Sequence, residues 1–317
     1  MAMNRVQFQP GLSMVEFVGQ YGSQRQCEQA LQAARWPDGF RCPKCSDTRY
    51  SFFERGGRGH WQCCRCRTQT TITAGTIFDS SKVPLTSWFL AMHLLTQSKN
   101  NVSALELKRH LGVSYPTAWL LKHKLMEVMA QREGSRVLAG RVEIDDAYLG
   151  GERPGQRGRG SENKIPFVVA VETSLDGKPL RVCFEAMRFI KQDIQTWANR
   201  RLAASAIVYS DGLASVKAGL ALEITNYHSI RTGSGRVSAL HPEFKAVNTV
   251  LGNLKTAISG TYHAFDFAKY APRYLAEVAY RFNRRFDLKV ILRRLITAAA
   301  QTRAYPMQKI RLAEGRC

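Results

Sequence analysis

The stretch Arg141-Val-Glu-Ile-Asp-Asp-Ala-Tyr-Leu149 decides how the second half of this chain folds. Apolar and polar residues alternate along it, which predicts a β-strand with Glu143 and Asp145 on the same face. Asp146 falls on the opposite face of that strand, and we interpret it as structural. Asp145 is therefore the first candidate for a functional carboxylate.

The pattern that follows this strand predicts a mixed sheet. Two more strand-like runs come next, then helices and short strands in alternation; we place the main elements at about 141–149, 165–172, 180–186, 191–202, 206–209 and 242–259. The order β-β-β-α-β-α-β-α describes a three-strand meander extended by αβ units. The expected fold class is α/β within a multidomain chain.

A second acid ends the apolar run Ala206-Ile-Val-Tyr-Ser-Asp211. Two carboxylates at the edge of adjacent strands can hold one or two Mg²⁺ ions, because this hard cation prefers oxygen ligands. Two such ions roughly 3.5–4 Å apart stabilise both the attacking and the leaving oxygen of an in-line phosphoryl displacement. The alternative is that Asp145 and Asp211 are strand-end or turn residues, since Asp-Gly is a common turn pair. Spacing alone leaves both interpretations open.

The helix expected at about 242–259 carries a polar pair on one side. Asn248 and Lys255 lie seven residues apart, about two helical turns, and so project from the same side. Such a side can present an oxygen ligand and a phosphate-binding cation to one DNA strand. On spacing alone, this is simply an amphipathic helix.

Two C-x2-C motifs, Cys42-Pro-Lys-Cys45 and Cys63-Cys-Arg-Cys66, are separated by seventeen residues. Zn²⁺ takes four tetrahedral thiolates, and each motif supplies two of them from one tight turn. The spacing predicts a zinc ribbon with structural Zn²⁺, whose folding depends on the metal. Cys64 breaks the spacing and is surplus. The alternative is a set of small buried thiols.

The charge of the chain indicates a polyanionic partner. Lys and Arg number 46 against 25 Asp and Glu, which gives a net charge of +21. A protein that binds nucleic acid gains counterion release from such charge, whereas an enzyme of small metabolites gains little. A ribosome-associated or membrane-surface protein is the alternative. The sequence has no apolar run long enough to span a membrane and no secretory signal, so we expect a cytoplasmic protein.

Residues 103–124 fit helix-turn-helix spacing. A helix ends at Gly112, and Ser114 is a plausible N-cap for the next helix, which carries Lys122 and Lys124. In such motifs the second helix enters the major groove of DNA. The alternative is an ordinary helical hairpin with a solvated basic face.

Several motifs in the same order resemble the bacterial insertion-sequence transposases that have an N-terminal zinc ribbon and an RNase H-like DDE catalytic domain. The resemblance runs from about Trp36 to Asp287. Beyond the cysteines it rests on Gly75-Thr-Ile-Phe78, Glu143-Ile-Asp-Asp-Ala-Tyr-Leu-Gly-Gly151, Gly158-Arg-Gly-Ser-Glu-Asn-Lys164, Tyr209-Ser-Asp-Gly212, the pair Asn248 and Lys255, and Gly260-Thr-Tyr-His263.

This resemblance implies metal-dependent DNA cleavage and strand transfer at transposon ends. It assigns the catalytic acids to Asp145 and Asp211, with Mg²⁺ or Mn²⁺ as the cofactor. The third acidic position falls on Asn248, a variant known in this branch, and the trailing basic residue is Lys255. It also implies double-stranded DNA as partner, both element ends and target, and a homo-oligomer assembled on that DNA.

The resemblance also divides the chain. We expect an N-terminal helical segment, a zinc ribbon, a helix-turn-helix-like DNA-binding segment, an RNase H-like catalytic domain and a basic C-terminal tail, at 1–35, 36–78, 79–135, 138–290 and 291–317. The basic residues expected to contact DNA are Lys122, Lys124, Arg157, Arg159, Lys164, Lys255, Arg284 and Arg285.

Two other classes of protein compete with this interpretation. One is a DNA-binding regulator without catalysis, for which the ribbon and the helix-turn-helix segment suffice. The other is an RNase H-like nuclease that cleaves DNA without strand transfer.

Overall fold

The computed structural model describes residues 6–150, 164–220, 224–230, 241–262 and 265–312. The chain forms two compact units, one of Met1–Val128 with Arg285–Arg311 and one of Met129–Arg284 with Leu312–Cys317. Among the described helices, none is both long and apolar enough to cross a bilayer.

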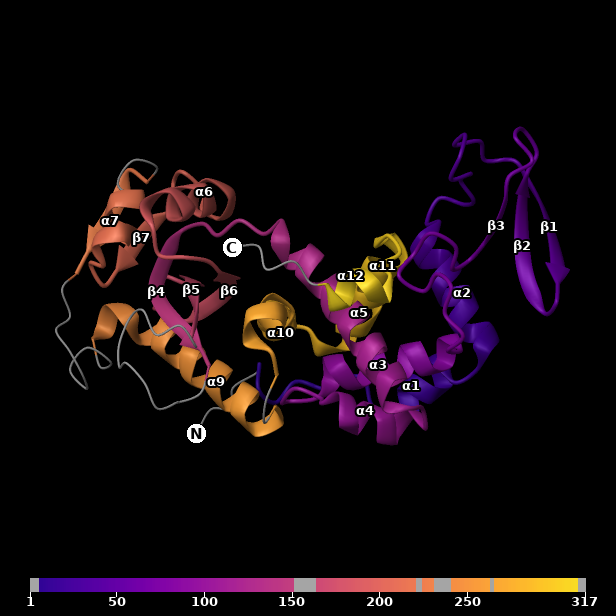
Figure 1. Cartoon of the computed structure of the whole chain (residues 1–317), viewed down its shortest axis with the longest axis horizontal. Coiled ribbons are helices and arrows are strands. Elements are labelled where there is room, and N and C mark those ends of the chain that lie inside the picture. The colour runs from indigo at the N-terminus through magenta and orange to yellow at the C-terminus, as the bar shows by residue number, and fades with distance from the viewer. Residues whose placement is uncertain (1–5, 151–163, 221–223, 231–240, 263–264, 313–317) are drawn as a thin grey trace. The chain divides into compact units, whose positions relative to one another are not determined.

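The first unit is built mainly of helices (Figure 1). Their bounds are α1 (Met14–Tyr21), α2 (Gln24–Arg35), α3 (Leu85–Gln97), α4 (Ala104–Leu111), α5 (Tyr115–Gly134), α11 (Leu288–Gln301) and α12 (Met307–Arg311). The last residues of α5, from Met129 on, belong to the second unit. Ser13 and Ser23 start α1 and α2 with capping boxes, in which the serine hydroxyl and the third helical residue satisfy each other's free N–H groups.

Helix α11, near the end of the described residues, is a packed part of this first unit. Helix α11 buries a stripe that includes Ile291, Leu292 and Leu295, and it packs against α2 and α3. The expectation of a basic tail over 291–317 is therefore wrong for the residues of α11. The segment is buried despite its charge because its leucine and isoleucine residues recur at helical spacing and form one apolar face.

The ribbon is a small antiparallel sheet of β1 (Tyr50–Arg55), β2 (Arg58–Cys63) and β3 (Gln69–Thr71). The strands follow the order β1-β2-β3, with Phe52 opposite Trp61. Its apolar interior is small, as expected for a fold that needs a metal.

The second unit contains one five-stranded mixed sheet. Its strands are β4 (Arg141–Leu149), β5 (Ile165–Thr173), β6 (Pro179–Ala186), β7 (Ile207–Ser210) and β8 (Asn226–Ser229), in the spatial order β6-β5-β4-β7-β8. β4, β5 and β6 form an antiparallel meander, whereas β7 and β8 lie parallel to β4. This is the predicted order of elements, and it is consistent with an RNase H-like domain.

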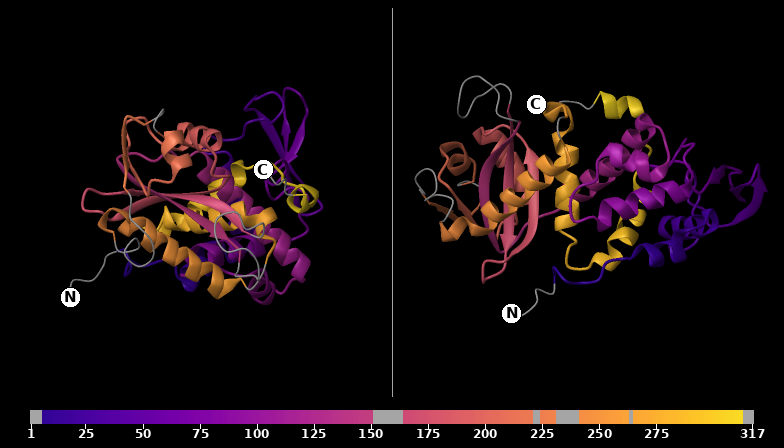
Figure 2. Two further views of the ribbon diagram at one scale, coloured as in Figure 1. Left: turned by 60° about the vertical axis from the view of Figure 1, so that its left-hand side comes forward. Right: turned by 90° about the horizontal axis from the view of Figure 1, so that it is seen from below.

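Helices cover both faces of this sheet (Figures 1 and 2). α6 (Lys191–Arg201) and α7 (Ala214–Leu220) pack on one face through Trp197, Val216 and their neighbours. The 3-10 turn η1 (Pro242–Phe244), α9 (Lys245–Thr261) and α10 (Phe267–Phe282) pack on the other. Both faces of the interior strand β5 are therefore buried, which explains its continuous apolar run.

Candidate metal centres

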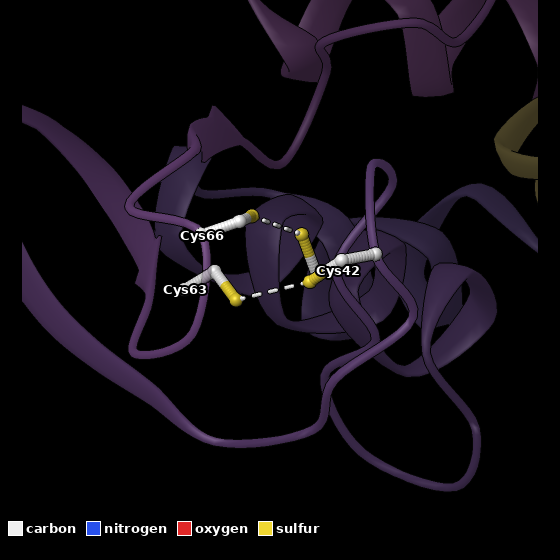
Figure 3. Close-up of side chains that lie close together, drawn as sticks. Cys42, Cys63 and Cys66 are labelled. Carbon is white, nitrogen blue, oxygen red and sulfur yellow. Dashed lines mark hydrogen bonds between the residues drawn. The ribbon is translucent and has the colours of Figure 1, made fainter.

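The four predicted zinc ligands converge in the ribbon. The Sγ atoms of Cys42 and Cys66 lie 3.5 Å apart and those of Cys45 and Cys63 lie 3.6 Å apart. Each close pair joins the two C-x2-C motifs (Figure 3). A tetrahedral Zn²⁺ with bonds of about 2.3 Å requires sulfur–sulfur edges of about 3.8 Å. The cluster therefore fits a structural zinc ion.

The two motifs have the same backbone geometry, which explains how they present their thiols together. In each one, the N–H four residues after the first cysteine donates to that cysteine's carbonyl: Ser46 to Cys42 at 3.0 Å and Arg67 to Cys63 at 3.1 Å. Ser46 and Arg67 both adopt the left-handed conformation, with φ of 60° and 59°. Two equivalent turns thus supply two thiols each.

The side chain of Thr68 tunes one ligand. The Cys66 sulfur donates to its hydroxyl at 3.2 Å, and hydrogen bonding with the Thr68 side chain and backbone lowers the pKa of that thiol to about 6. Because zinc binds the thiolate, this lowering favours the ligating form. Cys64 is exposed and stands outside the cluster, as its spacing predicts.

The second centre lies where two adjacent parallel strands, β4 and β7, stop pairing. β4 and β7 are paired as far as Ile144 opposite Ser210, so Asp145 and Asp211 follow directly on neighbouring strands. Carboxylate oxygens of Asp145, Asp146 and Asp211 all lie within 4.8 Å of one another. Negative charges this close repel unless a cation lies between them. The three half-buried acids therefore form a site that can bind a divalent metal.

The position of Asp146 differs from the one that its sequence pattern predicts. It was expected to be structural because it lies on the face opposite Asp145, yet its carboxylate joins the cluster. Pairing between β4 and β7 ends at Ile144, so both acids lie on the open β7 side of β4, while β5 still pairs with β4 on the other side. Asp211 also has a local structural role, since its Oδ1 accepts the Leu213 N–H at 3.1 Å just before α7.

Helix α9 is held against β4 by a buried carboxylate. The Glu143 Oε2 accepts the Val247 N–H at 2.9 Å, in the first turn of α9, where helix N–H groups lack partners of their own. The other Glu143 oxygen pairs with Arg141, which also pairs with Glu243 of the turn η1. The half-buried Asn248 follows Val247 directly in this first turn.

Comparison with known proteins gives the chain a family. Residues 137–283 match the ISXO2-like transposase domain, and residues 22–69 match the transposase zinc-ribbon domain. The two matches together cover more than half of the chain and include both metal centres. The chain belongs to the insertion-sequence transposases.

A curated relative supports this assignment. An uncharacterised protein in transposable element ISH50 of Halobacterium salinarum is 29% identical over 208 residues, which span 60% of this chain and 68% of the relative. Both transposase domains also suggest DNA as the partner of this chain.

The basic residues of the helical segment of this transposase do not lie as expected. Gly112 ends α4 in the left-handed conformation, and the Ser114 hydroxyl accepts the Thr117 N–H, as predicted. However, Lys122 is fully buried, and its Nζ donates a hydrogen bond to the Val102 carbonyl. Lys124 is also buried, and its Nζ donates to the Ile77 carbonyl.

This placement corrects the expectation that Lys122 and Lys124 contact DNA. Helix α5 is packed around most of its circumference. Its two buried lysines therefore hydrogen-bond to backbone carbonyls of the protein instead of reaching solvent. Exposed basic side chains are found instead at the end of α4, on Lys108 and Arg109.

Arg284 of the transposase is also buried rather than free. Its guanidinium pairs with Glu133 at 2.5 Å and lies 3.5 Å from the centre of the Tyr280 ring. The expectation that Arg284 is an exposed phosphate contact is therefore wrong. Arg285 is half-buried, and burial lowers its pKa to about 10.

The remaining basic residues stay predictions. Lys255 is exposed on α9, and the half-buried Lys164 stands directly before β5. Arg157 and Arg159 lie outside the described residues.

Proposed function

We propose that this transposase cleaves DNA at the ends of an insertion sequence and joins the freed ends to target DNA. The observation that carries the proposal is the convergence of three carboxylates just beyond the last residues that β4 and β7 pair. A water molecule attacks the scissile phosphate and releases a 3′-hydroxyl, which then attacks a phosphate of the target DNA. Each step breaks one phosphodiester P–O bond and forms another.

The acids of the cluster would hold Mg²⁺ or Mn²⁺. Divalent ions bound there supply the charge that stabilises the attacking and leaving oxygens of the displacement. Asp145, Asp146 and Asp211 contribute the negative charge. Asn248 contributes an amide oxygen from the first turn of α9, a ligand without charge, and the exposed Lys255 two turns later binds a neighbouring phosphate.

Cleavage and joining of a labelled transposon end test this function. The unaltered protein should cleave and join only with Mg²⁺ or Mn²⁺, and Asp145→Ala or Asp211→Ala should abolish both steps while DNA binding persists. Cleavage without joining would indicate a nuclease, and binding without cleavage would indicate a regulator. Activity retained by both alanine variants would contradict the proposed site.

The role of Asn248 has its own test. Asn248→Glu adds a charge to the cluster and should change the concentration of Mg²⁺ or Mn²⁺ required for cleavage, with the unfolding temperature nearly unchanged. Asn253 lies on the exposed side of the same helix, so Asn253→Glu is a matched control that should leave the metal requirement unchanged. An identical shift in both variants would remove Asn248 from the site.

We also propose that the active form is a homo-oligomer on DNA, because two element ends have to be joined in one event. The mass of the protein–DNA complex, measured with end fragments of defined length, tests this.

A further inference from the structure

An open hollow of about 460 Å³ lies in the sheet-containing unit, away from the acid cluster. Most of its lining is basic; the six residues are Arg132, Ser135, Arg136, Val137, Arg181 and Arg284. They come from the end of α5, the segment after it, the edge strand β6 and the segment that follows α10. All six belong to the same compact unit.

The acids near the hollow do not neutralise its arginines. The Glu133 carboxylate is shared by Arg136, at 3.0 Å, and Arg284, at 2.5 Å. The Glu172 carboxylate pairs with Arg181 at 3.0 Å. Two carboxylates thus face four guanidinium groups, and Arg132 forms no ion pair among the described residues. The hollow therefore keeps an excess of positive charge.

Two arginines of the hollow, Arg132 and Arg181, remain accessible to a ligand, whereas Arg284 is buried at its base. The side chain of Arg181 is 49% exposed, and Arg132 is also exposed. The planar guanidinium presents a fork of N–H donors that matches two oxygens of a phosphate. Sites for small molecules are enclosed and mostly apolar, whereas this one is open and polar. An open arginine-lined surface fits a phosphate on a polymer.

We propose that this hollow binds a backbone phosphate of DNA at a position distinct from the scissile one. The inference rests on the proposed function, because it takes DNA as the substrate. Arg181 is opposite Glu172, which is opposite Val142, three residues before Asp145 on β4. Arg181 is therefore two strands away from β4 across the sheet and three residues away from Asp145 along it. These two distances combine to roughly 14 Å between the hollow and the acids. About four base pairs of duplex span that distance.

Affinity for a duplex fragment, measured without divalent metal over a range of salt concentrations, tests the hollow apart from catalysis. The test variant is the double substitution Arg132→Ala/Arg181→Ala. It leaves the ion pairs of Arg136 and Arg284 with Glu133 in place. The matched control is Arg188→Ala/Arg200→Ala, which removes two exposed arginines of the same unit that do not line the hollow.

The hollow variant should bind more weakly, with the slope of log affinity against log salt reduced by about one per arginine. The loss should be equal for fragments with and without the element end, because phosphate contacts carry no sequence information. The control should keep the original slope.

Three outcomes would contradict the inference. An unchanged affinity and slope in the hollow variant would overturn it while leaving the proposed function intact. An equal loss in the control would show that general charge, rather than the hollow, binds DNA. Failure of the unaltered protein to bind DNA would overturn the inference and the proposed function together.

Discussion

At the scale of single residues, Glu143 ties the sheet of the transposase domain to the helix that carries Asn248. Its side chain is 1% exposed, and each carboxylate oxygen has its own partner, Arg141 on one side and the Val247 N–H on the other. Removing one partner of a buried ion pair leaves the other charge uncompensated. Glu143 therefore positions α9, two residues before Asp145 on the same strand.

We predict that Glu143→Ala lowers the free energy of unfolding by about 3–5 kcal/mol. Glu143→Gln should lower it by less, because the amide oxygen still accepts the Val247 N–H. Denaturant unfolding followed by circular dichroism measures both. Asp193→Ala is the control, since its pair with the exposed Arg188 is worth less than about 1 kcal/mol. Equal effects of Glu143→Ala and Asp193→Ala would contradict this role.

The buried histidine of α3 makes stability depend on pH. His93 is 4% exposed and packs against the ring of Phe17, and burial lowers its pKa from the ordinary value of 6.5. Below pH of about 6.5 the unfolded chain binds a proton that the folded protein does not. The unfolded state is then favoured, so stability falls as the pH falls.

We predict that between pH 7 and 5 the unaltered protein loses stability more steeply than His93→Leu. The difference in slope should be at most about 1.4 kcal/mol per pH unit. Thermal unfolding at several pH values measures it, with the exposed His110→Gln as a variant that should keep the original slope. Parallel curves for the unaltered protein and His93→Leu would rule out this contribution.

At the scale of elements, the turn between α4 and α5 depends on a residue that tolerates the left-handed conformation. Gly112 has a φ of 64°, and a Cβ atom built there would have no atom within 4 Å. The cost of another residue at this position is therefore conformational rather than steric. The helix-turn-helix spacing predicts this turn correctly, although the basic side chains of α5 point into the protein.

We predict opposite effects of one substitution at two glycines of the same unit. Gly112→Ala should lower the free energy of unfolding by about 1 kcal/mol, because alanine disfavours positive φ. Gly19→Ala, inside α1 with no atom within 4 Å of its Cβ, should raise it by up to about 1 kcal/mol. Denaturant unfolding distinguishes the two, and changes of the same sign would contradict the argument.

At the scale of the whole molecule, the sheet-containing unit and the zinc ribbon depend on different forces. The sheet-containing unit buries large apolar clusters on both faces of its sheet. The ribbon buries few side chains beyond its cysteines, with Phe40, Trp61 and Ile72 the main ones. Most of the folding free energy of the ribbon should therefore come from its metal.

We predict about one zinc per chain, and selective loss of the ribbon when a strong chelator removes it. Limited proteolysis should then cut within residues 40–75, while residues 129–284 stay protected. Cys63→Ser should abolish zinc binding, and Cys64→Ser should retain it, because the adjacent Cys64 lies outside the cluster. Zinc lost in both variants, or a ribbon that resists proteolysis without metal, would contradict this.

The sequence by itself determined the features that depend on local spacing. Two C-x2-C motifs define a zinc cluster because each turn is short enough to fix both of its thiols. Alternating and apolar runs define the strand order, and with it the meeting of Asp145 and Asp211, because the residues before the two acids pair in parallel.

Only the tertiary structure decided which polar side chains face solvent and which acids meet. Lys122, Lys124 and Arg284 are basic in the sequence, but segments distant along the chain bury them and supply their partners. Asp146 joins the cluster because pairing with β7 stops one residue before Asp145, a limit that periodicity does not contain. Burial depends on which elements pack together, and local spacing carries no information about that packing.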